Sequence, residues 1–250
     1  MRHKTLSYWS FALLNMMIVF AGNFCMAQQT SKVALVIGNS SYKSFPLRNP
    51  EHDAKDFAKS LKDLGYNVIE HTNIKTGEID SMLRDFRAKL VPGGVAIVFY
   101  AGHCVNVKNE NYLPAVDADV ATEEDIPLYS LALTRLMNVL VEADTRANLV
   151  FLDACTFGQK TVPPRTMISF AASPGAAVLD GDGRNGLYTG SLLEQIRKSD
   201  QPITSILEKV ASDVRLVSNG VQEPWAQGKV DEGFCMKECA VSSERNNSNN

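Results

Sequence analysis

Residues 95–104 have the sequence VAIVFYAGHC, and the first six of them are apolar without interruption. An apolar run without polar alternation is typical of a strand that is covered on both faces of a parallel sheet. The run follows Pro92-Gly93-Gly94, a turn sequence, and is followed by a glycine, a histidine and a cysteine. The segment therefore predicts a central strand with reactive side chains just beyond its carboxyl end.

Similar apolar runs alternate with helical patterns on both sides of this segment. Further strands are predicted at residues 33–37, 66–71, 147–153 and 167–172, and helices at residues 53–64, 76–90, 130–143, 187–196 and 203–217. Alternation of strands and helices implies right-handed crossover connections. The predicted fold class is α/β, with a mainly parallel sheet and helices on both faces.

Length and composition agree with one globular domain. The chain has 250 residues, of which 45% are hydrophobic and 21% charged, which excludes a disordered chain, a fibrous repeat and a disulfide-packed miniprotein. The chain has 25 Lys and Arg residues and 28 Asp and Glu residues, so its net charge is −3. The basic excess of a general nucleic-acid binder is absent, so no nucleic-acid partner is expected.

The first 27 residues have the layout of a secretory signal. Arg2, His3 and Lys4 are basic, residues 6–20 are mostly apolar, and small residues at Cys25 and Ala27 suit cleavage after Ala27. The apolar run is shorter than the ~20 residues that a spanning helix needs, so an uncleaved anchor is the second interpretation. We expect an exported chain, periplasmic or extracellular, that leaves the membrane after cleavage. Residues 241–250 are expected to form a disordered polar tail.

Side chains at the carboxyl ends of the predicted strands suggest a reaction centre. In open α/β sheets these ends meet at one edge, which brings His103 and Cys155 together. A lone histidine is more often structural, and a lone strand-end cysteine is usually a small buried hydrophobic residue. A Cys–His pair, however, is what nucleophilic acyl transfer requires, because imidazole takes the thiol proton and returns it to the leaving amine.

The motifs occur in an order that resembles the caspase-like cysteine peptidases, on the bacterial and metacaspase side of that group. The matching segments are residues 32–39, 47–54, 100–103, 152–155, 180–185 and 222–225. The resemblance implies a caspase-like three-layer sandwich, a peptidase domain over residues 28–240, and His103 and Cys155 as the catalytic dyad. The backbone N–H groups of Cys104 and Cys155 are expected to bind the oxyanion. No metal or other cofactor is expected for this chemistry, although activation by calcium stays open.

The same resemblance suggests which residue precedes the cut bond. Metacaspase-like enzymes receive Arg or Lys on acidic residues, and Asp53 and Asp153 match those positions. A carboxylate pairs with guanidinium through two parallel hydrogen bonds. The alternatives are that Asp53 favours a helix N-terminus and that Asp153 is a strand-end acceptor.

The segment Gly181-Asp182-Gly183-Arg184-Asn185-Gly186 matches a nucleotide-binding pattern only formally. It lacks the strand–turn–helix context that the pattern requires. Asp180 and Asp182 are possible calcium ligands, but the further ligands of an EF-hand are missing. We interpret the segment as a solvated loop.

Four cysteines remain after signal cleavage, in a compartment where disulfides persist. The family usually has glycine after the catalytic histidine, and this chain has Cys104. The favoured interpretation turns Cys104 into the core and leaves Cys235–Cys239 as the only bridge. The alternative is a Cys104–Cys155 disulfide that caps the nucleophile, which requires Cα atoms within roughly 4.4–6.8 Å.

The sequence thus predicts a cysteine endopeptidase that acts on a protein or peptide substrate and cuts after Arg or Lys. Two other classes stay open. One is a catalytically weak caspase-like binding or scaffold module of the cell envelope. The other is a redox-sensing thiol protein, suggested by Cys104 beside the dyad. The oligomeric state is left open.

Overall fold

The computed structural model describes residues 30–156, 158, 161–197 and 200–237. The expected signal segment and polar tail lie outside these residues. Among the described residues, no helix is both long and apolar enough to cross a bilayer.

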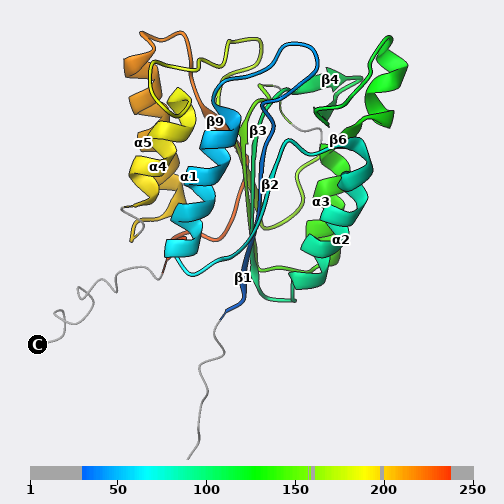
Figure 1. Ribbon diagram of the computed structural model, residues 1–250. Coiled ribbons are helices and arrows are strands. Elements are labelled where there is room, and N and C mark those ends of the chain that lie inside the picture. Colours follow the sequence, from blue (N-terminus) through cyan, green and yellow to red (C-terminus); the bar gives the residue numbers. More distant parts are fainter. Residues whose placement is uncertain (1–29, 157, 159–160, 198–199, 238–250) are drawn as a thin grey trace, which may run out of the picture.

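A six-stranded sheet runs through the middle of the molecule (Figure 1). In spatial order it consists of β2 (Asn67–Thr72), β1 (Lys32–Gly38), β3 (Val95–Ala101), β7 (Ala147–Asp153), β8 (Thr166–Phe170) and β9 (Trp225–Gly228). All neighbouring pairs are parallel except β8 and β9. Every residue of the central strands β3 and β7 is buried, as expected for unbroken apolar runs.

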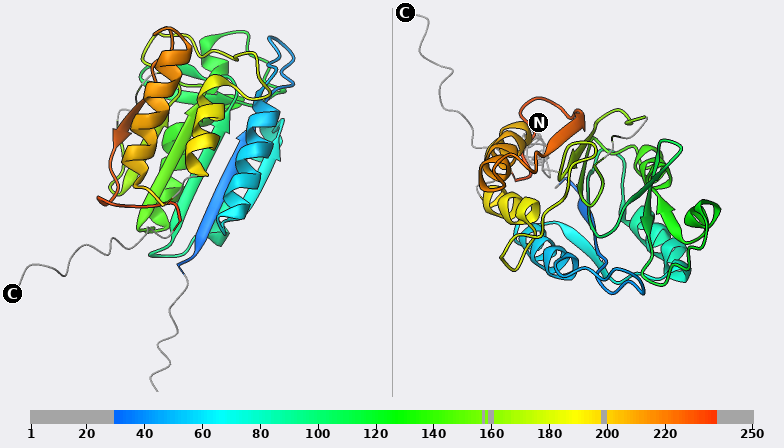
Figure 2. Two further views of the ribbon diagram at one scale, coloured as in Figure 1. Left: turned by 90° about the vertical axis from the view of Figure 1, so that its left-hand side faces the viewer. Right: turned by 90° about the horizontal axis from the view of Figure 1, so that it is seen from above.

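Helices cover both faces of the sheet (Figures 1 and 2). One face carries α1 (Pro50–Asp63), α4 (Leu187–Ile196) and α5 (Ile203–Val217), and the other carries α2 (Ile79–Lys89) and α3 (Leu133–Glu142). Short 3₁₀ helices, η1 (Thr76–Glu78) and η2 (Glu123–Leu128), precede α2 and β6. The predicted α/β sandwich is confirmed.

The core is split by the sheet into two layers. Along β1, Ala34 and Val36 belong to the layer under α1, α4 and α5, whereas Val33, Leu35 and Ile37 belong to the layer under α2 and α3. This alternation follows from the two-residue period of a strand. Each large aliphatic side chain buried in this way contributes roughly 1.5–3 kcal/mol of hydrophobic stabilisation. The two layers therefore hold the carboxyl ends of the central strands in fixed register.

The structure differs from the sequence-based expectation in its short elements. The predicted helix at residues 130–143 begins only at Leu133, because residues 130–132 form strand β6 (Ser130–Ala132). β6 pairs with β5 (Glu110–Pro114), which pairs with β4 (Val105–Val107), in a small antiparallel sheet. These strands and the edge strand β9 were not predicted. Strands of three to five residues are too short to show a clear period.

Candidate active site

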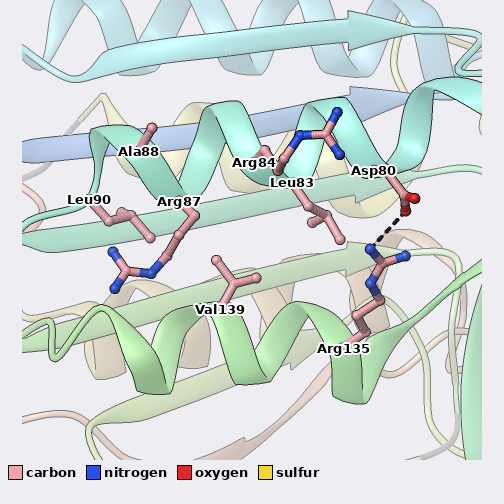
Figure 3. Close-up of a pocket in the computed structure, with 8 residues that line it drawn as sticks. All are labelled: Asp80, Leu83, Arg84, Arg87, Ala88, Leu90, Arg135 and Val139. Atoms are coloured by element: carbon pink, nitrogen blue, oxygen red, sulfur yellow. Dashed lines mark ion pairs between the residues drawn. The ribbon is translucent and has the colours of Figure 1, made fainter.

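Two hollows in the surface differ in their chemistry. One, of about 450 Å³, lies between α2 and α3 and is lined by apolar side chains and three arginines (Figure 3). Arg135 forms an ion pair with Asp80 there, and both side chains are more than half exposed. No histidine, cysteine or buried carboxyl lines this hollow. It therefore lacks the groups that acyl transfer requires.

The second hollow, of about 220 Å³, lies at the carboxyl ends of β1, β3 and β7. The strand that follows β1 in the six-stranded sheet is β2, on the side of β1 away from β3, and the strand that follows β3 there is β7, on the side of β3 away from β1. The connections that leave β1 and β3 therefore run in opposite directions. Such a switch point is where open α/β sheets bind ligands. The hollow brings together Asp53, His103, Cys104 and Asp153, four of the five predicted site residues. The fifth, Cys155, does not line it and is only 2% exposed.

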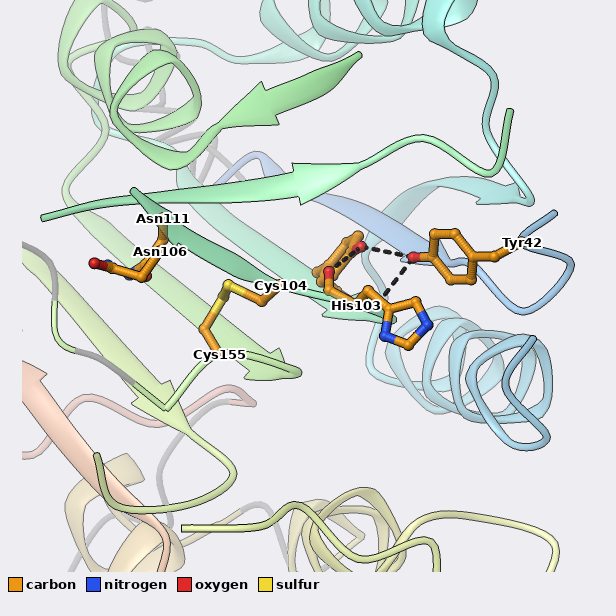
Figure 4. Close-up of a disulfide and its surroundings, with 7 residues drawn as sticks. Tyr42, His103, Cys104, Asn106, Asn111 and Cys155 are labelled. Carbon is orange, nitrogen blue, oxygen red and sulfur yellow. Dashed lines mark hydrogen bonds between the residues drawn. A yellow bond between two sulfur atoms is a disulfide. The ribbon is translucent and has the colours of Figure 1, made fainter. Parts of the chain in front are cut away.

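The backbone of His103 is held by two tyrosines (Figure 4). The Tyr100 hydroxyl donates to the His103 carbonyl at 2.8 Å, and the His103 N–H donates to the Tyr42 oxygen at 3.0 Å. The Tyr42 hydroxyl then donates to the Tyr100 oxygen, 3.1 Å away. Burial raises the pKa of both phenols, so they keep the protons that this network needs.

The imidazole of His103 is oriented by a backbone atom. Its Nε2 lies 2.6 Å from the carbonyl oxygen of Phe45, and its ring centroid lies 4.5 Å from that of Tyr42. A carbonyl oxygen only accepts, so Nε2 carries the proton of this hydrogen bond. In the neutral ring Nδ1 is then unprotonated. That nitrogen is the one available as a base.

Gly102 allows the two tyrosines to approach His103. A Cβ at this position would lie 2.6 Å from the Tyr42 hydroxyl oxygen and 2.7 Å from that of Tyr100, and the φ of Gly102 is +155°. A larger residue would therefore clash as well as adopt an unfavourable backbone conformation.

Cys104 and Cys155 are joined by a disulfide (Figure 4). The register explains it, because Ala101 of β3 lies beside Asp153 of β7, so both cysteines follow within three residues of adjacent positions. Their Cα atoms are 5.2 Å apart, within the range that a disulfide spans. The favoured prediction, that Cys104 turns into the core away from Cys155, is wrong. Cys235 is also disulfide-bonded, and Cys239, its expected partner, lies outside the described residues.

The disulfide-bonded residues Cys104 and Cys155 have backbone N–H groups without a partner among the described residues. Cys104 is not among the described non-glycine residues with positive φ, so a side chain is tolerated at the position where the family usually has glycine. Within the described residues, no hydrogen bond uses the backbone N–H groups of Cys104 or Cys155. Both N–H groups are therefore unused donors within that part of the chain.

Asp53 and Asp153 come from different elements and face the same space. Asp53 lies in the first turn of α1 and accepts from the Gly186 N–H at 3.1 Å; Asp153 ends β7 and accepts from the Thr189 hydroxyl at 2.5 Å. A Cβ at Gly186 would lie 3.2 Å from Asp153 Oδ2 and 3.6 Å from Asp53 Oδ2. The two carboxyl groups thus converge beside Gly186.

Burial raises the pKa of both carboxyl groups. Asp53 is 2% exposed and Asp153 is 8% exposed. The neighbouring charge of Asp153 raises the pKa of Asp53 further, and hydrogen bonds from Thr189 partly offset the burial of Asp153. Two like charges so close together oppose each other's ionisation. A cation bound between them would relieve that repulsion.

Residues 181–186 form the loop before α4 that the sequence predicted. Arg184 is paired with Asp56 at 2.8 Å, and Arg48 donates to the Gly183 carbonyl at 3.2 Å, so the loop is tied to α1 and to the segment before it. Among the described residues there is no group of three or more His, Cys, Asp or Glu side chains that could hold a metal ion.

Several residues of the site were not predicted. Phe45 acts through its carbonyl, which has no sequence signature, and its side chain is 82% exposed. Tyr42 and Tyr100 lie at or just beyond the ends of two predicted strands, where functional groups gather. Gly186 could have been noticed only as the last glycine of the predicted loop.

Comparison with known proteins agrees with the observed fold. The family model of the caspase domain matches residues 31–234. The chain is 24% identical over 198 residues to human mucosa-associated lymphoid tissue lymphoma translocation protein 1. That match covers 73% of this chain but only 24% of the human protein, so the chain spans about a quarter of that relative's length.

Two solved structures are similar in fold. Caspase-1 from Spodoptera frugiperda gives a TM-score of 0.65 at 17% identity, covering 85% of this chain and 92% of that one. A protein from Geobacter sulfurreducens gives 0.63 at 15% identity, covering 84% and 97%. Because the family model spans most of the chain and the fold agrees, the chain belongs to the caspase-domain family of cysteine peptidases.

Proposed function

We propose that this chain is a cysteine endopeptidase that hydrolyses peptide bonds after Arg or Lys, with Cys155 and His103 as its dyad. The observation that carries the proposal is the pair of buried carboxyl groups, Asp53 and Asp153, in the hollow that His103 also lines. Burial raises the pKa of both carboxyl groups, although each also accepts a hydrogen bond, so a bound cation would stabilise the ionised pair.

In the proposed reaction, reduced Cys155 gives its thiol proton to Nδ1 of His103 and its sulfur attacks the carbonyl carbon of the substrate. The backbone N–H groups of Cys104 and Cys155 stabilise the negative oxygen that forms. His103 then donates the proton to the leaving amine, which departs as the acyl-enzyme forms. Water, deprotonated by the same imidazole, hydrolyses the acyl-enzyme and frees the thiol.

The hollow suits one basic side chain. Its volume of about 220 Å³ is below the ~300 Å³ at which pockets for whole small molecules begin. A guanidinium or ammonium group placed beside Gly186 would reach both carboxyl groups. Its positive charge favours their ionised forms, so the raised pKa of each would fall on binding.

The cellular setting belongs to the same proposal. Residues 1–27 direct export, and residues 28–240 act on a protein or peptide in the periplasm or outside the cell. The reaction as written needs no cofactor. Calcium remains a variable for the assay, because the acidic loop at Asp180 and Asp182 lies near the hollow.

The test is a library of fluorogenic peptides varied at the residue before the cut, assayed with a thiol reductant, with and without calcium. The wild-type protein should cleave after Arg or Lys, and Cys155→Ala should lose turnover by on the order of 10⁶, the loss seen when a nucleophile is removed. Cleavage after Asp would contradict the pocket. A reduced protein that cleaves none of the peptides would favour the scaffold class instead.

A further inference from the structure

We propose that the Cys104–Cys155 disulfide is a redox gate, opened by a thiol reductant that enters through the acidic hollow and attacks the sulfur of Cys104. The inference rests on the proposed function in one respect, namely that the Cys155 thiolate released by the attack is the peptidase nucleophile.

The disulfide keeps the site from reacting. The sulfur of Cys155 is bonded to that of Cys104, so it has no thiolate with which to attack a carbonyl. The imidazole of His103 lies toward Tyr42 and away from the sulfur–sulfur bond (Figure 4). Breaking the bond is therefore the first step of any turnover.

Access decides which sulfur is attacked. Cys104 is partly exposed and lines the hollow, whereas Cys155 is 2% exposed and packs in the layer beneath it. Thiol–disulfide exchange requires the incoming thiolate to reach the sulfur that it attacks. Attack at Cys104 also makes Cys155 the leaving group, which is the outcome that the peptidase needs.

The exchange balances with a dithiol as reductant. One thiolate of the dithiol bonds to the Cys104 sulfur, the disulfide breaks, and Cys155 leaves as thiolate. The second thiolate of the dithiol then attacks the mixed disulfide, which frees Cys104 and closes a disulfide within the reductant. Two electrons pass from the dithiol to the protein, and the two cysteines take up the two protons that the dithiol gives up.

Charge in the hollow selects among reductants. Asp153 and Asp180 line the same space as Cys104, and Asp53 adds a further negative charge once the pH passes its raised pKa. An anionic thiol therefore approaches against like charge and a cationic thiol approaches with it. Once rates are corrected for the thiolate fraction of each reagent, cysteamine should react faster than mercaptoethanol, and mercaptoethanol faster than glutathione. The physiological reductant is then expected to present a neutral or basic surface around its reactive thiol.

The first experiment measures peptide hydrolysis by protein purified without reductant. Dithiothreitol should raise the wild-type rate by on the order of 100-fold, because a blocked nucleophile leaves only residual reduced protein active. Cys104→Ser should be active without dithiothreitol. Cys235→Ser, which removes a different disulfide-bonded cysteine, should keep the dependence. Equal wild-type rates with and without dithiothreitol would overturn the gate.

The second experiment does not depend on activity or on a variant. Oxidised wild-type protein is treated briefly with mercaptoethanol and then with iodoacetamide, and the adducts are located by peptide mass mapping. The gate predicts mercaptoethanol on Cys104 and carbamidomethyl on Cys155. Mercaptoethanol on Cys155, or alkylation of Cys155 without any thiol, would overturn it.

The two experiments separate failure of the gate from failure of the proposed function. If mass mapping gives the expected adducts but the reduced protein hydrolyses no peptide, the exchange at Cys104 stands and the peptidase proposal falls. If the reduced and untreated proteins are equally active, the peptidase stands and the gate falls.

Discussion

The site has an acidic half, formed by Asp53 and Asp153, and a sulfur half, formed by Cys104 and Cys155. Each half is a pair of like groups, but Asp53 and Asp153 oppose each other's ionisation, whereas Cys104 and Cys155 are joined by a covalent bond. Asp153 and Cys155 are only two residues apart at the end of β7. The proposed substrate-binding half is therefore assembled while the proposed reactive half is closed, and binding should be measurable in the oxidised protein without turnover.

The largest effect that would sharpen this comparison concerns stability. The disulfide joins residues 51 positions apart, and closing a loop of that length in the unfolded chain is worth about 4 kcal/mol. Cys104→Ser should lower the free energy of unfolding in urea by about that amount under oxidising conditions. A loss below about 1 kcal/mol would mean that the bond does not constrain the unfolded chain. Tm measured by calorimetry on the same variant provides the check.

The next effect concerns the acidic half alone. Asp53→Asn should weaken kcat/KM for an Arg peptide by about 3 kcal/mol, roughly 100-fold, because a desolvated guanidinium loses one of its two charged partners. Asp182→Asn is the matched control, since Asp182 lies in the nearby loop and does not line the hollow. Both variants are assayed in reductant, so the Cys104–Cys155 disulfide is reduced in each and does not affect the comparison. Equal losses of kcat/KM in the two variants would contradict the assignment of Asp53 to substrate binding.

A third effect is a dependence on pH, which involves both carboxyl groups. Both carboxyl groups have a raised pKa in the folded protein, so as pH rises above the ordinary carboxyl value of about 4, the unfolded chain ionises before the folded one. The stability of the free protein should therefore fall as pH rises from that value to the raised pKa of each group. For one carboxyl group the fall is about 1.4 kcal/mol for each pH unit between its unfolded and folded pKa values. Urea unfolding at a series of pH values measures it.

Binding should change in the opposite direction. An arginine amide should bind the oxidised protein more tightly as pH rises over the same range, because the second carboxyl group ionises. Titration calorimetry at several pH values measures this, and Asp53→Asn should flatten the profile. An affinity that falls with pH would contradict the assignment of the pair.

The sequence predicted the long elements because their patterns are local. The bounds of β7, α4 and α5 agree with the predicted ones, since an unbroken apolar run or a helical period marks each of them. The candidate site was predicted in outline for the same reason, as His103 and Asp153 stand at recognisable strand ends.

What the sequence did not predict depends on contacts across the fold. Spacing alone does not give the register that sets Ala101 beside Asp153, and that register is what brings the two sulfurs together. The favoured interpretation of Cys104 was wrong for this reason. The small sheet of β4, β5 and β6 was missed because each of its strands is held by its neighbour and not by its own pattern.

The carbonyl of Phe45 has a consequence for genetics. An alanine scan deletes side chains, and the Phe45 side chain is 82% exposed, so the scan would rate this position as dispensable. The atom that orients His103 belongs to the main chain and survives almost every substitution. Proline is the informative exception, because it fixes φ near −65°, whereas Phe45 has a φ of 57°. Most substitutions at position 45 therefore leave the orientation of the His103 ring unchanged.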